Sequence, residues 1–219
     1  MGRLVLMDLD NTLINRNGAV TDWITDFSAA RGLSAEAVQA LSAALRERAT
    51  PDTFEGMRST LGLAEPAVEL WDSYVAGLAS RVVCAPATLS RLDRLRAGGW
   101  SVGVLTNGAT DVQQAKLTAT GILDRVDAVC ISEEIGARKP EPEAFRVAVA
   151  RLGGELPDDV WMVGDNPVTD IAGARAAGLR TIWISAGSGW SFPVQAPDHI
   201  AETAVDAADF LLELPETSR

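Results

Sequence analysis

The chain has 219 residues, 47% of them apolar, and a formal net charge of −11 at pH 7. This length predicts one large domain or two unequal ones, with a sizeable buried core. The negative charge repels polyanions, and no apolar run approaches the ~18 residues of a membrane span, so we expect neither a nucleic-acid nor a membrane partner. Cytoplasmic is the default expectation. Cys84 and Cys130 lie in apolar segments and are interpreted as small buried side chains.

The first predicted element is a strand over residues 4–7, a short apolar run that ends at two aspartates. The next interval contains no strand-like run and at least three helical patterns. We expect the first helix to be capped by Thr21 or Asp22 and to end near Gly32, the second to open at Ser34, and the last to cover residues 65–79.

These patterns predict a small α-helical cap domain over residues 15–83, inserted after the first strand. Its expected hinges are residues 15–18 and 81–86. Within the insert, the aromatic side chains fall at helical spacings and are interpreted as the core of the cap. They are Trp23, Phe27, Trp71 and Tyr74.

After the insert, helical and strand-like segments alternate. The helical patterns cover residues 86–97, 142–152 and 169–177, and the strand-like runs cover residues 102–105, 126–131, 160–163 and 181–184. The runs are too short for helices and rich in β-branched residues, as is typical of strands buried on both faces. Residues 1–14 and 84–219 are therefore predicted to form an α/β core, a parallel Rossmann-like sheet with helices on both faces.

Polar side chains follow four of these strands, at the sheet edge where such folds bind ligands. They are Asp8 and Asp10 after the first, Thr106 and Asn107 after the second, Lys139 beyond the third, and Asp165 and Asp170 after the fourth. Carboxylates this close repel one another unless a cation neutralises them, and hard oxygen ligands favour magnesium. A magnesium site beside a lysine suits phosphoryl transfer, and it gives an acidic protein a local positive pocket.

Each segment alone has a plainer interpretation as a turn or a helix cap. The aspartates of the first segment also resemble the start of a calcium loop, but Leu13 and Ala19 stand where such a loop needs Gly and Glu. The only histidine, His199, excludes histidine-rich zinc sites and is interpreted as a surface or sheet-edge residue. The order of the four segments at successive strand ends is what favours a shared site.

Taken together, the segments resemble the four motifs of the haloacid dehalogenase superfamily, in that family's order: Asp8-Leu9-Asp10-Asn11-Thr12, Thr106-Asn107-Gly108, Lys139-Pro140, and Gly164-Asp165 with Asp170. The helical insert resembles the type 1 cap of phosphoglycolate-phosphatase-like members. The resemblance implies a hydrolase that acts on a small phosphorylated metabolite.

The resemblance also implies roles for individual residues. Asp8 resembles the nucleophile that forms a phospho-aspartyl intermediate, and Asp10 the general acid that later acts as the base. The Thr106 hydroxyl and the Asn107 backbone would hold the phosphoryl group, and Lys139 would pair with the nucleophile and the phosphate.

For the implied Mg²⁺ cofactor, the resemblance gives Asp165 as a ligand beside Asp8 and the Asp10 carbonyl, with Asp170 supporting the metal or its waters. The cap of such enzymes closes over the core and contacts the leaving group. Arg16 and Arg58 are the cap residues that we expect to face the substrate.

The resemblance allows other reactions of the superfamily, and two of them do not fit this sequence. The family's dehalogenases carry tyrosine at the position of Asp10, which argues against dehalogenation. Its phosphonate hydrolases need a lysine in the cap, whereas no lysine precedes Lys116. A phosphosugar mutase of the same superfamily and a non-catalytic regulatory protein on this fold remain alternatives. Sugar phosphates, phosphoglycolate and nucleoside monophosphates all remain possible substrates, and the oligomeric state is open.

Overall fold

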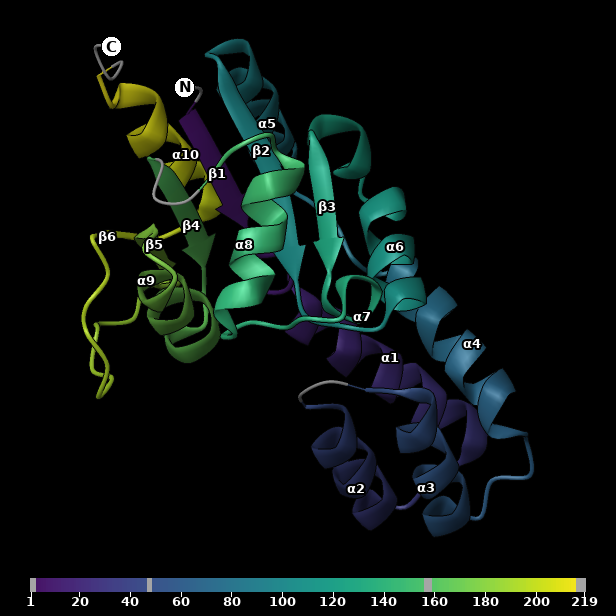
Figure 1. The fold of residues 1–219 in the computed structure, drawn as a ribbon. Helices are drawn as coiled ribbons and strands as arrows, with labels where there is room; N and C mark the ends of the chain where they lie inside the picture. The colour runs from purple at the N-terminus through teal and green to yellow at the C-terminus, as the bar shows by residue number, and fades with distance from the viewer. Residues whose placement is uncertain (1–2, 47–48, 156–158, 216–219) are drawn as a thin grey trace.

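The structure is a computed structural model that describes residues 3–46, 49–155 and 159–215. Within these residues the chain forms a six-stranded sheet in the order β3-β2-β1-β4-β5-β6, and every neighbouring pair is parallel (Figure 1). The strands are β1 (Arg3–Met7), β2 (Trp100–Thr106), β3 (Ala128–Ile131), β4 (Val160–Gly164), β5 (Arg180–Ile184) and β6 (His199–Ala201). The predicted α/β fold class is confirmed.

Helices cover both faces of this sheet, which is why its central strands are almost continuously apolar. In β1, Val5 and Met7 join one apolar cluster, and Leu4 and Leu6 join a second one on the opposite face. The first cluster includes side chains from α5 (Pro86–Ala97), α6 (Thr110–Ala119) and α10 (Ala204–Glu213), and the second includes side chains from α8 (Pro142–Arg151) and α9 (Gly173–Ala176).

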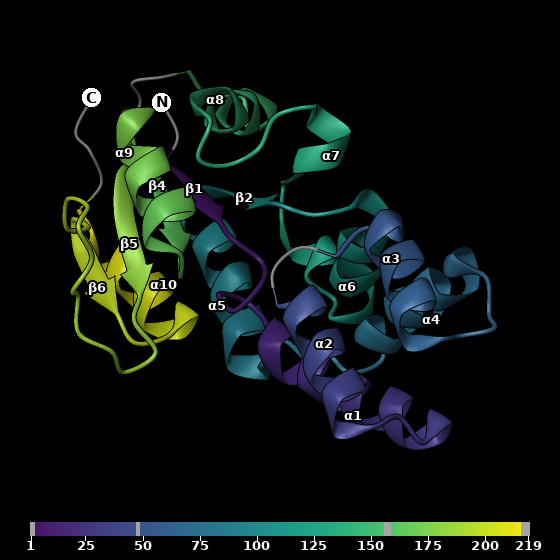
Figure 2. The same cartoon turned by 90° about the horizontal axis from the view of Figure 1, so that it is seen from below.

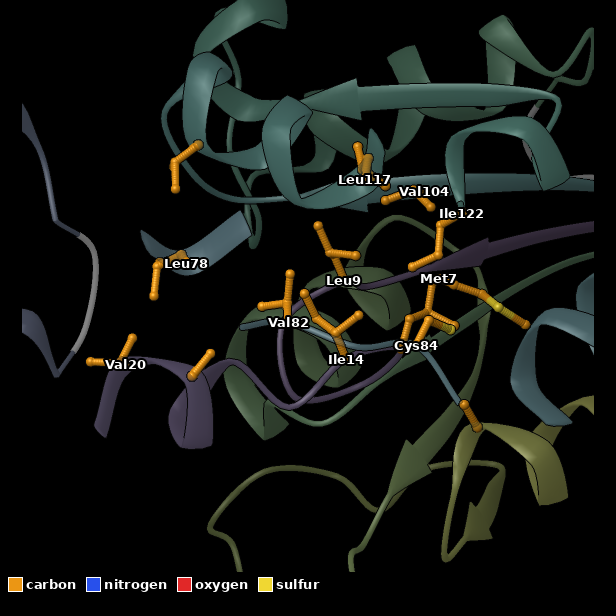
Figure 3. Packing of buried hydrophobic residues seen from close by; sticks show 14 of the residues in the cluster. Met7, Leu9, Ile14, Val20, Leu78, Val82, Cys84, Val104, Leu117 and Ile122 are labelled. Carbon is orange, nitrogen blue, oxygen red and sulfur yellow. The ribbon is translucent and has the colours of Figure 1, made fainter. Parts of the chain in front are cut away.

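Four further helices lie beyond the carboxyl ends of the strands (Figures 1 and 2). We call them the cap helices: α1 (Arg16–Arg31), α2 (Ala35–Leu45), α3 (Pro51–Leu61) and α4 (Ala67–Ala79). Their apolar side chains belong to the same cluster as one face of the sheet, and Figure 3 shows Val20 and Leu78 of the cap with Leu9 and Val104 of the core. Whether residues 15–83 form a separate domain stays a prediction.

The first cap helix begins earlier than predicted. Its N-cap is Asn15, whose side-chain oxygen accepts the N–H of Gly18 at 2.9 Å. The expected cap at Thr21 or Asp22 was wrong because both residues lie inside the helix, and the expected hinge at residues 15–18 is the first turn of α1. Ser34 caps α2 as predicted, with its side chain accepting the N–H of Ala37.

Other differences concern short or polar elements. The helices α3, α6 and α10, the short α7 (Ser132–Ile135) and the edge strand β6 were not predicted. The pattern over residues 169–177 is a π-helical turn (Pro167–Ala172) followed by α9. Cys84 and Cys130 are buried as expected. Among the described residues, the longest helices are too short or too polar to cross a membrane.

Candidate active site

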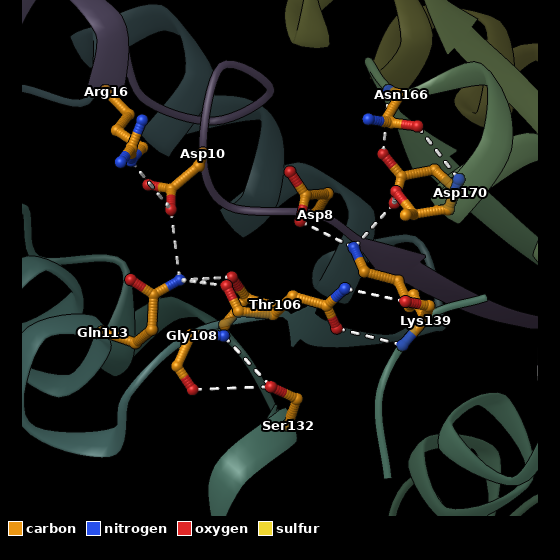
Figure 4. A network of polar contacts seen from close by, with 12 residues as sticks. Asp8, Asp10, Arg16, Thr106, Gly108, Gln113, Ser132, Lys139, Asn166 and Asp170 are labelled. Atoms are coloured by element: carbon orange, nitrogen blue, oxygen red, sulfur yellow. Dashed lines mark hydrogen bonds and ion pairs between the residues drawn. The ribbon is translucent and has the colours of Figure 1, made fainter. Parts of the chain in front are cut away.

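Asp8 stands at the carboxyl end of β1, in the middle of the sheet. Its backbone N–H donates to the carbonyl of Val163 at 2.9 Å and so continues the ladder between β1 and β4. The ammonium of Lys139 donates to Asp8 Oδ1 at 2.7 Å and lies at the same distance from Asp170 Oδ1 (Figure 4). Lys139 is 2% exposed and Asp170 is 1% exposed, so both charged side chains are buried.

Asp165 completes a cluster of three carboxylates with Asp8 and Asp170. One oxygen of each lies within 4.8 Å of the others. The backbone N–H of Asn166 donates to Asp170 Oδ2 at 3.0 Å and fixes that side chain. Gly164 leaves the space that the Asp170 carboxylate occupies, since a Cβ at this position would lie 2.3 Å from Asp170 Oδ2.

The electrostatics of this cluster call for another cation. Burial and the neighbouring carboxylates of Asp170 and Asp165 raise the pKa of Asp8 to about 8, although Lys139 opposes this. Burial, and then repulsion from Asp170, raises the pKa of Asp165 to about 6. Burial lowers the pKa of Lys139, but the attraction of Asp170 and Asp8 is stronger and raises it overall. One lysine therefore does not balance three carboxylates, and an oxygen-only donor set of this kind fits Mg²⁺.

Asp10 lies on the other side of the site, within a second set of polar contacts. The Lys116 ammonium lies 2.6 Å from Asp10 Oδ1 and 2.8 Å from Asp10 Oδ2. Gln113 Nε2 donates to Asp10 Oδ2 at 3.2 Å, and Arg16 Nε is 4.0 Å from the same oxygen. Gln113 and Lys116 come from α6, and Arg16 from the start of α1. Burial lowers the pKa of Lys116, while the attraction of Asp10 opposes this.

Thr106 and Asn107 connect the two sides at the end of β2. Gln113 Nε2 lies 2.5 Å from Thr106 Oγ1. The side-chain amide of Asn107 donates to the carbonyl of Lys139 at 2.9 Å and accepts its N–H at 3.0 Å. This reciprocal pair fixes the backbone that carries the buried lysine. The Asn107 side chain thus has a positioning role that its sequence context did not indicate.

A cavity of about 220 Å³ opens between these residues and the cap. Its walls include all seven core residues predicted from sequence, together with Ala49, Tyr74 and Leu78 of the cap. Arg16 also lines it, and its guanidinium donates to the carbonyls of Leu45 and Arg46 at 3.0 and 3.2 Å, at the end of α2. The structure does not bring Arg58 to the cavity: it lies on α3, paired with Glu55.

Comparison with known proteins identifies the family. The model of the haloacid dehalogenase-like hydrolases matches residues 3–178, which include every motif residue of the site. The chain belongs to the haloacid dehalogenase-like hydrolases. The family that the motifs indicated is therefore confirmed.

Named relatives of this haloacid dehalogenase-like hydrolase include phosphatases. Phosphoserine phosphatase of Thermus thermophilus is 35% identical over 163 residues, 74% of this chain and 64% of that protein. Phosphoglycolate phosphatase of Cereibacter sphaeroides is 36% identical over 107 residues, 49% of this chain and 47% of that protein. The chain thus matches about half to two-thirds of the length of these relatives.

A solved structure of the same family has a similar fold. The HAD phosphatase from Thermococcus onnurineus superimposes on this haloacid dehalogenase-like hydrolase with a TM-score of 0.72 at 27% sequence identity. The match covers 95% of this chain and 97% of that one. The cap helices and the sheet are therefore both included in the similarity.

Sequence reasoning missed two side chains of this site, Gln113 and Lys116. Both lie on α6, which was not predicted, and they are two of the four buried residues of that helix. One feature of the sequence could have pointed to Lys116. Of the 19 basic residues only Lys116 and Lys139 are lysines, and both contact an aspartate of the first motif.

The cap aromatic residues lie where expected, and two of them also contribute to the site. Trp23, Phe27, Trp71 and Tyr74 are all buried. Tyr74 lines the cavity, and Trp71 Nε1 of α4 donates to Asp111 Oδ2 of α6 at 2.5 Å. This hydrogen bond joins the cap to the helix that carries Gln113 and Lys116.

Proposed function

We propose that the protein is a magnesium-dependent phosphatase that hydrolyses a small phosphorylated metabolite through a phospho-aspartyl intermediate on Asp8. The observation that carries the proposal is the placement of the Asp8 carboxylate. It lies at the wall of a cavity, 2.7 Å from a buried ammonium and within a carboxylate cluster suited to a divalent cation. The names of the phosphatase relatives support the same reaction class.

In the first half of the reaction, a carboxylate oxygen of Asp8 attacks phosphorus and the bond from phosphorus to the leaving oxygen breaks. Asp10 donates a proton to that oxygen, and the product alcohol departs. In the second half, Asp10 takes a proton from a water molecule that attacks the phosphoryl group, which releases phosphate and restores Asp8. Lys139 offsets negative charge on Asp8, and the Thr106 hydroxyl donates to a phosphoryl oxygen.

The residues that would hold Mg²⁺ are Asp8, Asp165 and Asp170, together with the backbone carbonyl of Asp10. The bound ion supplies positive charge that offsets the negative charge of the phosphoryl oxygens. The acidic residues of the cluster are suited to this ion because they offer only oxygen donors and carry more negative charge than Lys139 neutralises.

The dimensions of the site favour a short substrate. At about 220 Å³, the cavity is smaller than the roughly 300–1,000 Å³ of pockets that hold drug-sized ligands. After the phosphoryl group is accommodated, the remaining space suits a leaving group of a few carbon atoms. Phosphorylated hydroxy acids, amino acids and short sugars are therefore the proposed class.

Phosphate release from a panel of phosphomonoesters tests the function. The wild type is measured with Mg²⁺ and with EDTA, and Asp8→Asn serves as the chemically inactive variant of nearly equal volume. Release that needs Mg²⁺ and is lost in Asp8→Asn supports the proposal, provided that thermal melts show both proteins folded. Isomerised sugar phosphate without release would indicate a mutase, and release that persists in Asp8→Asn would refute the covalent mechanism.

A further inference from the structure

We propose that Lys116 is a positioning residue that, together with Gln113, fixes the orientation of the Asp10 carboxylate and so determines how well Asp10 transfers protons. This inference rests on the proposed phosphatase function. It concerns two side chains of α6 that the family resemblance of the motifs did not assign. Both line the same cavity as Asp8 and Asp10.

The geometry of the contact is specific. The Lys116 ammonium approaches both oxygens of Asp10, at 2.6 and 2.8 Å, and the residue is 1% exposed. Gln113 Nε2 lies 3.2 Å from Asp10 Oδ2 and 2.5 Å from Thr106 Oγ1. Both Asp10 oxygens thus have a donor, and the carboxylate is tied to the phosphate-binding end of β2.

The surrounding backbone is shaped for this arrangement. Gly108 lies beside Gln113, and a Cβ there would come within 2.6 Å of Gln113 Cγ. The absence of a side chain at Gly108 therefore lets Gln113 reach across to Thr106 and Asp10. An apolar residue at position 116 would fill the same interior without burying a charge. A buried ammonium aimed at the acid–base residue is hence better explained by a role at Asp10 than by packing.

The consequence for the reaction follows from the geometry of proton transfer. A general acid or base acts efficiently only when its carboxylate is held within hydrogen-bonding reach of the reacting oxygen. Without Lys116, the Asp10 side chain loses the contact that spans both of its oxygens. Steps that need Asp10 should slow, whereas attack by Asp8 on an ester with a good leaving group needs no proton from Asp10.

The experiment compares Lys116→Met with Gln114→Met, an exposed position on the same helix. For the best alkyl phosphate of the panel, we expect kcat of Lys116→Met to fall about 100-fold, the lower end of general acid–base effects, with KM nearly unchanged. With p-nitrophenyl phosphate, we expect a burst of about one nitrophenolate per active site followed by slow turnover, because the departure of nitrophenolate needs no proton. Gln114→Met should match the wild type in both assays.

A double variant distinguishes positioning from direct substrate contact. If Lys116 acts through Asp10, adding Lys116→Met to Asp10→Asn should change kcat by less than about twofold. Losses that multiply would mean that Lys116 acts on the substrate itself and would overturn the inference. A Lys116→Met enzyme with wild-type kcat on the alkyl ester would overturn it as well.

Thermal melts give a readout that is independent of turnover. Asp10→Asn should lower Tm when Lys116 is present, because it leaves a buried ammonium without its carboxylate, and should lower it less in the Lys116→Met background. Equal shifts in both backgrounds would contradict the contact. A folded wild type that hydrolyses no ester would refute the proposed function itself, whereas an active wild type with an unaffected Lys116→Met would refute only this inference.

Discussion

Replacing Lys139 by methionine tests the electrostatic account of the site most directly. Lys139→Met keeps a long, flexible side chain but removes the positive charge between Asp8 and Asp170. One oxygen of each of these two carboxylates lies within 4.8 Å of the other. At an effective dielectric constant of about 20, two unit charges at that separation repel by about 3.5 kcal/mol. This agrees with the ~3–5 kcal/mol measured when one partner of a buried ion pair is removed.

The assay is urea denaturation of the metal-free protein, followed by fluorescence of its tryptophans. Asp8, whose pKa is about 8 with Lys139 present, holds a proton near pH 6 and must ionise at high pH. We therefore expect Lys139→Met to lower the free energy of unfolding by up to about 3 kcal/mol at pH 8.5 and above, and by clearly less near pH 6. Arg58→Met is the matched control, because it removes a cation from an exposed pair with Glu55 and should leave the free energy of unfolding nearly unchanged.

A second variant identifies the cause. Asp170→Asn removes one of the two facing charges at nearly constant volume, so Lys139→Met/Asp170→Asn should be more stable than Lys139→Met alone at high pH. The free energy of unfolding of Lys139→Met could instead fall by less than about 1 kcal/mol at pH 8.5, or by the same amount at both pH values. Either result would show that Lys139 does not offset repulsion between Asp8 and Asp170.

Three further predictions concern the same site. Because the pKa of Asp8 rises from 3.8 to about 8 and that of Asp165 from 3.8 to about 6, the folded metal-free protein holds protons that the unfolded chain releases. Its free energy of unfolding should therefore fall as pH rises from about 4 to about 8, and saturating Mg²⁺ should reverse that trend in urea titrations. Gly164→Ala should weaken Mg²⁺ binding at least about tenfold by calorimetry, since the new Cβ would displace the Asp170 carboxylate; unchanged affinity would contradict the crowding. Trp71→Phe removes the hydrogen bond between cap and core and should cost about 1–2 kcal/mol in urea denaturation, and a cost near zero would show that this contact does not hold the cap helices.

The sequence predicted five of the six strands of the described sheet and the motif residues that line the cavity, because both depend on local signals. Short β-branched runs specify buried parallel strands, and the fold brings the residues after each run to one edge. Asp8, Lys139 and Asp170 therefore meet although they are far apart in the chain. The family match over residues 3–178 confirms the interpretation of these motifs at the level of the family.

The parts that escaped prediction depend on contacts that no local pattern encodes. The buried face of α6 carries Gln113 and Lys116 beside two apolar residues, so its apolar periodicity is interrupted at the two side chains that contact Asp10. Arg16 and Arg58 looked equivalent as cap arginines. Only the structure separates them, since Arg16 reaches the end of α2 and Asp10, whereas Arg58 pairs with its neighbour Glu55.

The charge balance of the cavity shows what a protein of net charge −11 needs in order to bind the proposed phosphate ester. Seven charged side chains line the cavity, four acidic and three basic: Asp8, Asp10, Asp165, Asp170, Arg16, Lys116 and Lys139. Their formal sum is −1, so the cavity alone does not favour a phosphate ester. A divalent cation would change that sum to +1. The lysines and Arg16 thus bring the site close to neutrality, and the sign of the field that the substrate meets depends on the metal.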